Sequence, residues 1–467
     1  MLLVINRGRL ASSACLSQAK LRPGEALLRP LQRRVASAST DSIRSYSNSS
    51  PSSWQRPCSD PLRILFCGSD HFSCASLRAL HKELRQGSDQ DGGGLIRSID
   101  VVVRPAKPTG RGYKVLREVP LRILADELGF PVHERDTFRG WDMPRPDGDP
   151  INLIIAVSFG LFVPPRLIHA AKYGGLNVHP SFLPDLRGPA PIHHAFLLGR
   201  PHTGVTIQTL SPASFDAGVP LMQTPRPGIP VPDLLDLPGG NQAGGEGGGG
   251  AHPFETLHNQ LAAEGARMLV ETLKRGLHVP PYRSCLPGAD EQNRARGDFR
   301  SYAHAPKITP ADKQLPLVRL ARAAAVRSRV LGPLWARARV RKEARGKKKK
   351  GGQGREGAPD GEGARPSSAV VETKRVIFED LEPAAPRPEP AKEGRVRWVV
   401  QKRPGSEGGE AACDEEYLGR YLPGPDKTSA LVQLHDGSWL RVGRIKVEGS
   451  TSQPALSVLE SLRAPEE

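Results

Sequence analysis

Three polar residues, Asn177, His179 and Asp216, have the side chains needed to act together on a carbonyl group. Asn177 and His179 are two positions apart, so on a β-strand their side chains point to one face. Pro180 cannot continue a strand ladder, so we expect the strand to end at His179. Asp216 follows 37 residues later, in Phe215-Asp216-Ala217-Gly218. A converging amide, imidazole and carboxylate can stabilise an oxyanion and move a proton.

The segments around these residues predict an α/β domain with a mostly parallel, Rossmann-like sheet. Short apolar runs alternate with helix-like stretches. We expect strands over 62–67, 99–103, 152–158, 176–179 and 204–210, and helices over 73–85, 120–129, 164–171 and 190–198. Ligands of such sheets bind beyond the carboxyl ends of the strands, where Asn177 and His179 fall. Asp216 joins them there if the strand over 204–210 is parallel to its neighbours.

These residues alone leave other interpretations open. An Asn-x-His pair at a strand end often serves only turn geometry, and an Asp before Ala-Gly is often a turn residue. His193 and His194 have no partner at metal-ligand spacing, so we expect no metal. The turn at Gly68 has a single glycine, and no dinucleotide fingerprint or Walker-type loop is present in the sequence.

Longer stretches add a family resemblance. The sequences LNVHPSFLPDLRGPAPI (176–192) and FDAGVPLMQ (215–223) resemble the signature segments of the 10-formyltetrahydrofolate-dependent formyltransferases. The RGPAPI ending, RPAKPTGRGYK (104–114) and ILFCGSD (64–70) look most like the branch of that family that formylates methionyl-tRNA. The resemblance covers about residues 60–310, and 418–455 is similar in layout to the small C-terminal barrel of that branch.

The resemblance implies a formyltransferase fold, 10-formyltetrahydrofolate as the formyl donor and methionyl-tRNA as the acceptor. It makes Asn177, His179 and Asp216 the catalytic residues. It also implies a folate site lined by Val157, Ser158, Phe159, Gly160, Ser181, Phe182, Leu183 and Pro184. The loop 104–114 would contact the tRNA through Lys107, Arg111 and Lys114. Lys107 stands where the family has an Arg, and Lys lacks the planar guanidinium fork; Phe182 stands where Leu is usual.

Positive charge is concentrated in two segments of the 467-residue chain. The formal charge is +17, of which residues 1–50 carry +6 and residues 311–350 carry +12, so the remainder carries −1. The first segment is rich in Arg and Ser and nearly free of acids, which predicts a mitochondrial targeting peptide over 1–46 and a matrix location. An ordinary basic tail and a plastid address are the alternatives.

The second basic segment interleaves arginines with apolar residues and ends in a lysine run, which is typical of nucleic-acid binding. A solvated helix with a solubilising tail is the alternative. The tRNA contacts that we expect from it are Arg341, Lys342, Lys347, Lys348, Lys349 and Lys350.

The expected organisation is a targeting peptide followed by two domains and their linkers. The catalytic domain spans 60–280, with a Gly-rich insertion at 233–252, and a basic linker and helix span 281–350. A low-complexity linker at 351–369 leads to a small, OB-like β-barrel domain at 370–467 that binds tRNA and contains a linker at 383–394.

Other classes of protein are disfavoured. Six cysteines form no C-x-x-C pair, which argues against a zinc ribbon or a disulfide framework. The longest apolar run, 151–163, is too short and interrupted to cross a bilayer, so we expect no membrane insertion. We also expect a monomer. Two functional alternatives remain: another folate-dependent formyltransferase, such as one acting on glycinamide ribonucleotide, and an inactive RNA-binding protein with this fold.

Overall fold

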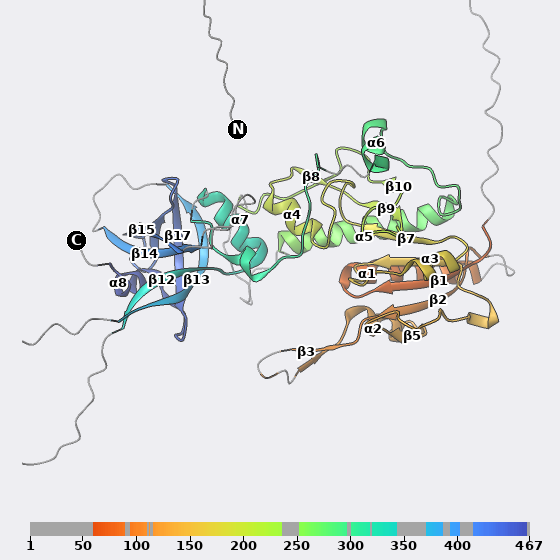
Figure 1. Cartoon of the computed structure of the whole chain (residues 1–467), viewed down its shortest axis with the longest axis horizontal. Helices are drawn as coiled ribbons and strands as arrows, with labels where there is room; N and C mark the ends of the chain where they lie inside the picture. Colours follow the sequence, from red (N-terminus) through yellow and green to blue (C-terminus); the bar gives the residue numbers. More distant parts are fainter. Residues whose placement is uncertain are drawn as a thin grey trace, which may run out of the picture. The chain divides into compact units, whose positions relative to one another are not determined.

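A computed structural model gives the architecture of the chain (Figure 1). It describes residues 59–88, 94–109, 112, 115–235, 252–296, 300–317, 320–342, 370–385, 393–401 and 414–464, all within the compact unit Gln55–Glu467. The expected targeting peptide, nearly all of the Gly-rich insertion and the linker at 351–369 lie outside these residues. So do Arg111, Lys114 and Lys347–Lys350.

The N-terminal domain is built on a seven-stranded sheet in the order β10-β9-β7-β6-β1-β2-β5. The strands β1, β2, β5, β6 and β7 are parallel, which confirms the expected mostly parallel sheet. However, β9 is antiparallel to β7, so the parallel orientation considered for 204–210 is wrong. The bounds are β1 (Leu62–Gly68), β2 (Ile96–Val103), β5 (Val132–Glu134), β6 (Leu153–Val157), β7 (Gly175–His179), β9 (Thr206–Thr209) and β10 (Pro220–Gln223).

Helices cover both faces of this sheet. Successive residues of a strand point to opposite sides, and here both sides carry apolar side chains that must be buried. In β1, Ile64 and Phe66 pack into one apolar cluster, whereas Leu65 and Cys67 pack into another. The helices are α1 (His71–Ser88), α2 (Pro120–Glu127), α3 (Pro165–Ala170), α4 (Pro191–Leu197) and α5 (Pro253–Lys274). In chain order, β2 and β5 are added on one side of β1, and the strand order then reverses, so that β6 and β7 lie on the other side. In sheets of this type, the ligand crevice lies at such a reversal, which here falls at the carboxyl ends of β1 and β6.

The C-terminal domain is a closed antiparallel barrel. Its strands pair in the order β13-β12-β14-β15-β16-β17, and β13 also pairs with β17. The expected small barrel is therefore confirmed, with six strands where an OB-fold has five. The bounds are β12 (Leu334–Lys342), β13 (Val370–Ala384), β14 (Gly394–Gln401), β15 (Asp414–Pro423), β16 (Ala430–Gln433) and β17 (Trp439–Val447), followed by β18 (Gln453–Pro454) and α8 (Ala455–Ser461).

The barrel begins earlier in the sequence than expected. Residues 334–342, assigned above to a basic linker, form β12, directly after helix α7 (Ala321–Leu331). Leu334, Ala336 and Ala338 are buried in the barrel and alternate with Trp335, Arg337 and Arg339, a period of two that defines a strand. At its other end, β13 extends through Pro383 and Ala384, which the sequence analysis placed in a linker.

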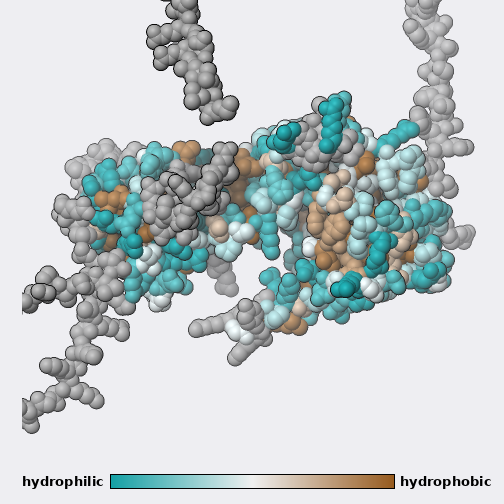
Figure 2. All heavy atoms as spheres, viewed as in Figure 1, coloured by the Kyte–Doolittle hydropathy of each residue, from teal (hydrophilic) through white to brown (hydrophobic). Residues whose placement is uncertain are grey.

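Shorter elements complete the described chain. They are β3 (Lys107–Thr109), β4 (Val115–Arg117), β8 (His202–Thr203), β11 (Ile229–Pro230), α6 (Gly288–Arg296) and the 3-10 helices η1 (Pro146–Gly148) and η2 (Pro310–Lys313). The face drawn in Figure 2 is mostly hydrophilic, and hydrophobic residues appear on it in patches. In the described residues, every helix is too short or too polar to cross a membrane.

Candidate active site

Strand β7 places Asn177 and His179 on one face at its carboxyl end. Asn177 pairs in register with Ala156 of β6, and its Nδ2 donates to the Ala156 carbonyl over 2.9 Å. This bond uses one of the two amide hydrogens. His179, two residues on, is 5% exposed. The strand ends there, as Pro180 predicts.

Asp216 reaches His179 by a different route from the one expected. Because β9 is antiparallel to β7, the chain leaves β9 at the far end of the pair and returns through the loop before β10. Asp216 adopts a left-handed conformation in this loop, with φ of 52°. Its Oδ1 lies 3.4 Å from Nδ1 of His179, and its Oδ2 accepts from the Gly188 amide over 3.0 Å. The structure thus brings the three predicted catalytic residues together.

A fourth residue, Gln208, was missed by the sequence analysis. It lies on β9 directly opposite Asn177 and is 1% exposed. Its Nε2 donates to Asn177 Oδ1 over 3.1 Å and to Asp216 Oδ1 over 3.2 Å, and its Oε1 accepts from the Gly218 amide. The available signal was a glutamine in the middle of the strand expected over 204–210, since an amide buried in a sheet needs hydrogen-bond partners.

The imidazole of His179 has an oxygen acceptor near each nitrogen. Nδ1 faces Asp216, and Nε2 lies 3.1 Å from the Leu186 carbonyl. The ring can donate to both oxygens only when it carries both protons. With Nδ1 directed at Asp216, the N–H on Nε2, which here faces the Leu186 carbonyl, is the one that a developing negative charge can take over.

The first group of expected folate residues begins at Val157, the last residue of β6. Val157 and Phe159 are buried, whereas Ser158 and Gly160 are exposed and have positive φ values of 48° and 70°. These exposed residues extend beyond the carboxyl end of β6, next to the end of β7 that carries Asn177. They therefore lie where a ligand in the crevice can approach the backbone.

The second group of expected folate residues, Ser181 to Pro184, is buried after His179. The Ser181 hydroxyl donates to the Asp185 carbonyl over 2.7 Å. The Phe182 ring fills the space above Gly228, where a Cβ atom would lie 2.4 Å from the ring. The guanidinium carbon of Arg226 lies over the same ring, 3.9 Å from its centre. In this structure, these side chains shape the turn that follows β7.

The residues expected to contact tRNA fall at separate places. Lys107 is exposed on β3, where it pairs with Arg117 of β4, so the expected loop includes the first strand of a short hairpin whose second strand follows it. Arg341 and Lys342 are the last residues of β12 in the barrel. The other expected contacts lie outside the described residues.

Comparison with known proteins places the chain in a family. Residues 62–233 match the formyl transferase family model. Over 297 residues, the chain is 37% identical to the mitochondrial methionyl-tRNA formyltransferase of Saccharomyces cerevisiae, covering 60% of this chain and 70% of that protein. The chain belongs to the methionyl-tRNA formyltransferase family. A second family member, from Ehrlichia chaffeensis, is 31% identical over 234 residues, which cover 50% of this chain and 67% of that protein.

Other family members match over a shorter range. The methionyl-tRNA formyltransferase of Bacillus thuringiensis is 37% identical over 168 residues, 35% of this chain and 48% of that protein. Among solved structures, a sugar N-formyltransferase from Shewanella aligns with a TM-score of 0.38 and 14% identity, covering 58% of this chain and 88% of that one. The sugar 3N-formyltransferase WlaRD aligns with a TM-score of 0.41 and 11% identity, covering 84% and 100%.

Two other kinds of site, a metal centre and a nucleophilic cysteine, can be checked among the described residues. In the described part of the chain, no cluster of three His, Cys, Asp or Glu side chains is arranged to hold a metal ion. Cys67 and Cys74 are buried near β1, and burial raises the pKa of both thiols. A raised pKa disfavours the thiolate, so neither is suited to act as a nucleophile at neutral pH.

Proposed function

We propose that the chain transfers the formyl group of 10-formyltetrahydrofolate to the α-amine of methionyl-tRNA by means of Asn177, His179 and Asp216. Membership of the methionyl-tRNA formyltransferase family supplies the reaction. The observation that supports the residue assignment is the 3.4 Å contact between His179 and Asp216, next to Asn177 at the carboxyl end of β7. Donor and acceptor would meet at this edge of the sheet.

In the proposed mechanism, the free α-amine of the esterified methionine attacks the formyl carbon. An α-amine has a pKa near ~8, and esterification lowers it, so the neutral amine is available near neutral pH. The attack forms a C–N bond and a tetrahedral oxyanion. The second hydrogen of Asn177 Nδ2, which the Ala156 carbonyl does not use, is available to this oxyanion. The N–H on Nε2 of His179, released from the Leu186 carbonyl, supplies the other donor, and each is expected to contribute roughly 10²–10³ in rate.

Collapse of the intermediate breaks the bond to the folate nitrogen, which takes up a proton as the attacking amine loses one. Asp216 orients the His179 ring and relays the proton toward the leaving nitrogen. The reaction thus needs no covalent intermediate with the protein. Gln208 acts as a positioning residue because it contacts both Asn177 and Asp216 and is buried beneath them.

The tRNA would be held outside the catalytic crevice. Residues 311–350 carry +12, and β12 places arginines on the outside of the barrel. Such contacts are mainly to phosphates, and they bind without reading sequence. Lys107, on the exposed β3–β4 hairpin, is the proposed contact from the catalytic domain.

The proposed location is the mitochondrial matrix, with 10-formyltetrahydrofolate and methionyl-tRNA as substrates for translation initiation there. The support is the similarity to a mitochondrial relative and the Arg-rich, acid-poor composition of residues 1–46. A reporter fused to residues 1–46 should enter the matrix and lose this segment. A cytosolic reporter would contradict the assigned location.

The decisive experiment supplies 10-formyltetrahydrofolate and charged methionyl-tRNA and measures formyl-methionine after hydrolysis of the ester. His179→Ala is the control for background transfer. Formylation of glycinamide ribonucleotide in place of methionyl-tRNA would favour the purine-pathway alternative. Binding of tRNA without turnover would favour the inactive scaffold.

A further inference from the structure

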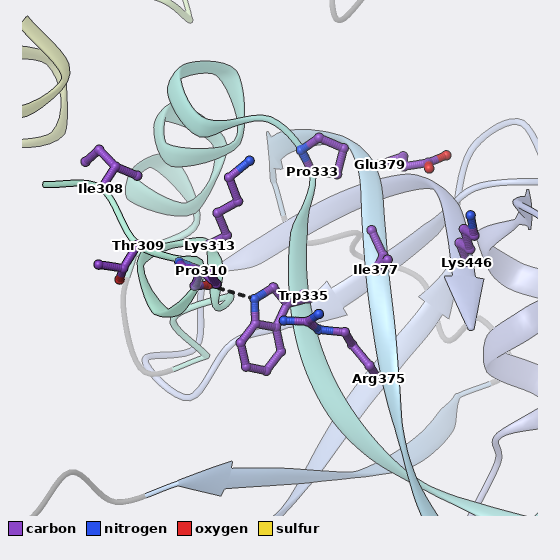
Figure 3. A pocket seen from close by; sticks show the side chains of 10 residues that line it. All are labelled: Ile308, Thr309, Pro310, Lys313, Pro333, Trp335, Arg375, Ile377, Glu379 and Lys446. Carbon is purple, nitrogen blue, oxygen red and sulfur yellow. Dashed lines mark hydrogen bonds between the residues drawn. The ribbon is translucent and has the colours of Figure 1, made fainter. Parts of the chain in front are cut away.

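A pocket of about 590 Å³ lies on the outside of the C-terminal barrel (Figure 3). One wall is the segment 308–313, and the others come from the start of β12 and from β13 and β17. This wall belongs to the barrel, because the Leu315 amide donates to the Trp335 carbonyl over 2.7 Å and Leu315 is buried in the barrel core. We call it the Trp335 pocket.

The aromatic side of the pocket is a single, firmly held indole. Trp335 Nε1 donates to the Pro310 carbonyl over 3.0 Å, and the guanidinium of Arg375 lies 4.2 Å from the centre of the ring. Trp335 remains half-buried. Figure 3 shows the indole and Arg375 side by side at the edge of the pocket. An aromatic ring fixed in this way, together with a guanidinium plane, offers a stacking surface at low entropic cost.

The charged side of the pocket is positive. Lys313, Arg375 and Lys446 line it against one carboxylate, Glu379. Among the described residues, none of these three cations has an ion-pair partner, whereas Arg339 on the same strand as Trp335 is paired with Glu416. The unpaired cations leave an excess of two positive charges available to an anionic ligand.

The floor of the pocket is apolar. Ile377 lies between Trp335 of β12 and Lys446 of β17 in the strand register, and Pro310 and Pro333 complete the surface. A groove that bound only duplex phosphates would need charge but no apolar floor. A flat apolar ring with phosphates on either side is the chemistry of a single nucleotide whose base is unpaired.

We propose that the Trp335 pocket binds one unpaired nucleotide of the tRNA substrate, with the base against Trp335 and the adjoining phosphates on Lys313 and Lys446. The proposal rests on the proposed function, because it takes the acceptor to be a tRNA. It assigns a site separate from the catalytic crevice and from the basic residues 341–350. The pocket holds the tRNA without touching the reacting atoms.

The test compares full-length variants in binding to an uncharged tRNA transcript and to a blunt RNA duplex. Trp335→Ala should weaken tRNA binding roughly tenfold, as expected for one lost base stack, with the salt dependence unchanged. Trp335→Phe should retain binding within about threefold. Lys446→Gln should make the slope of log affinity against log salt shallower by about 0.7–0.9, as for one phosphate contact. Lys427→Gln, an exposed lysine between β15 and β16, is the charge-matched control and should leave the slope unchanged.

The blunt duplex tests the claim that the bound nucleotide is unpaired. Because a duplex offers no free base, the affinity of the protein for the duplex should be the same in wild type and Trp335→Ala. At saturating tRNA, every pocket variant should keep the wild-type kcat for formylation. If Trp335→Ala and Lys446→Gln both bind tRNA like wild type, the pocket assignment is wrong, while continued formylation leaves the proposed function standing. If wild type formylates no methionyl-tRNA, the proposed function itself fails. Should Trp335→Ala unfold, Trp335→Phe and Lys446→Gln still decide the outcome.

Discussion

Gln208 stands directly opposite Asn177 in the antiparallel pair of β7 and β9, and its Nε2 donates to Asn177 Oδ1 over 3.1 Å. The bond fixes the direction of the Asn177 carboxamide, because it occupies the oxygen and leaves the nitrogen to donate. The same Nε2 reaches Asp216. One buried side chain therefore orients two of the three proposed catalytic residues.

Gln208→Met removes these hydrogen bonds while keeping the length of the side chain. We expect kcat to fall roughly 10- to 100-fold, because two contacts that orient transition-state groups are lost at about 1 kcal/mol each. KM for both substrates should change by less than about twofold. Gln208→Glu should add a limb to the kcat–pH profile, because the introduced carboxyl group lies against a second carboxylate and its own pKa is raised. Steady-state kinetics across pH measure both effects, and a wild-type kcat in Gln208→Met would contradict the positioning role.

His179→Ala and Asp216→Ala should each lower kcat by about 10² or more, because each removes a proposed oxyanion or proton partner. Folate affinity should change little. Single-turnover formylation separates this loss from product release. Near-wild-type turnover in His179→Ala would refute the assigned mechanism.

The sequence predicts β7 correctly, because Asn177 and His179 are two positions apart and therefore share one face, and Pro180 marks the end of the strand. The sequence does not predict the direction of β9, because the same apolar run is compatible with a parallel and with an antiparallel strand. Asp216 was nevertheless placed in the site, by family resemblance. The period-two pattern of β12 is hard to recognise in the sequence, because Arg337 and Arg339 alternate with Ala336 and Ala338 in a segment whose charge is also typical of nucleic-acid binding.

His278 makes stability depend on pH. It is fully buried, with Nε2 3.0 Å from the Ser59 hydroxyl, and burial lowers its pKa to about 4. In the unfolded chain the pKa is about 6.5, so between these values the unfolded state binds more protons. Stability should therefore fall as pH decreases through this range, by about 2 kcal/mol from pH 7 to pH 5. Denaturant unfolding at the two pH values should show this loss in wild type and a smaller one in His278→Gln. Parallel losses would show that His278 is not responsible.

The basic segment should contribute affinity for tRNA without contributing to the chemical step. Replacing Arg341, Lys342 and Lys347–Lys350 with Gln should raise KM for methionyl-tRNA and leave kcat nearly unchanged, because binding common to ground and transition states is lost. The slope of log affinity against log salt should become shallower by about two to three. Filter binding at several salt concentrations measures it. An unchanged slope would make the segment a solubilising linker.

The barrel is closed by the pairing of β13 with β17, so its shape does not depend on how long the β12–β13 and β14–β15 connections are. Lys342 and Val370 form the last pair of β12 and β13, and residues 343–369 join them. Likewise, Gln401 pairs with Asp414 at the ends of β14 and β15, and residues 402–413 join those strands. Each connection begins and ends at one strand pair, so both of its ends keep their places when it is lengthened. For a flexible loop, each doubling of length costs about 0.6 kcal/mol of closure entropy. Sequence can therefore be inserted at these two points over evolutionary time with little thermodynamic penalty and without moving the arginines or Trp335 on the outer wall.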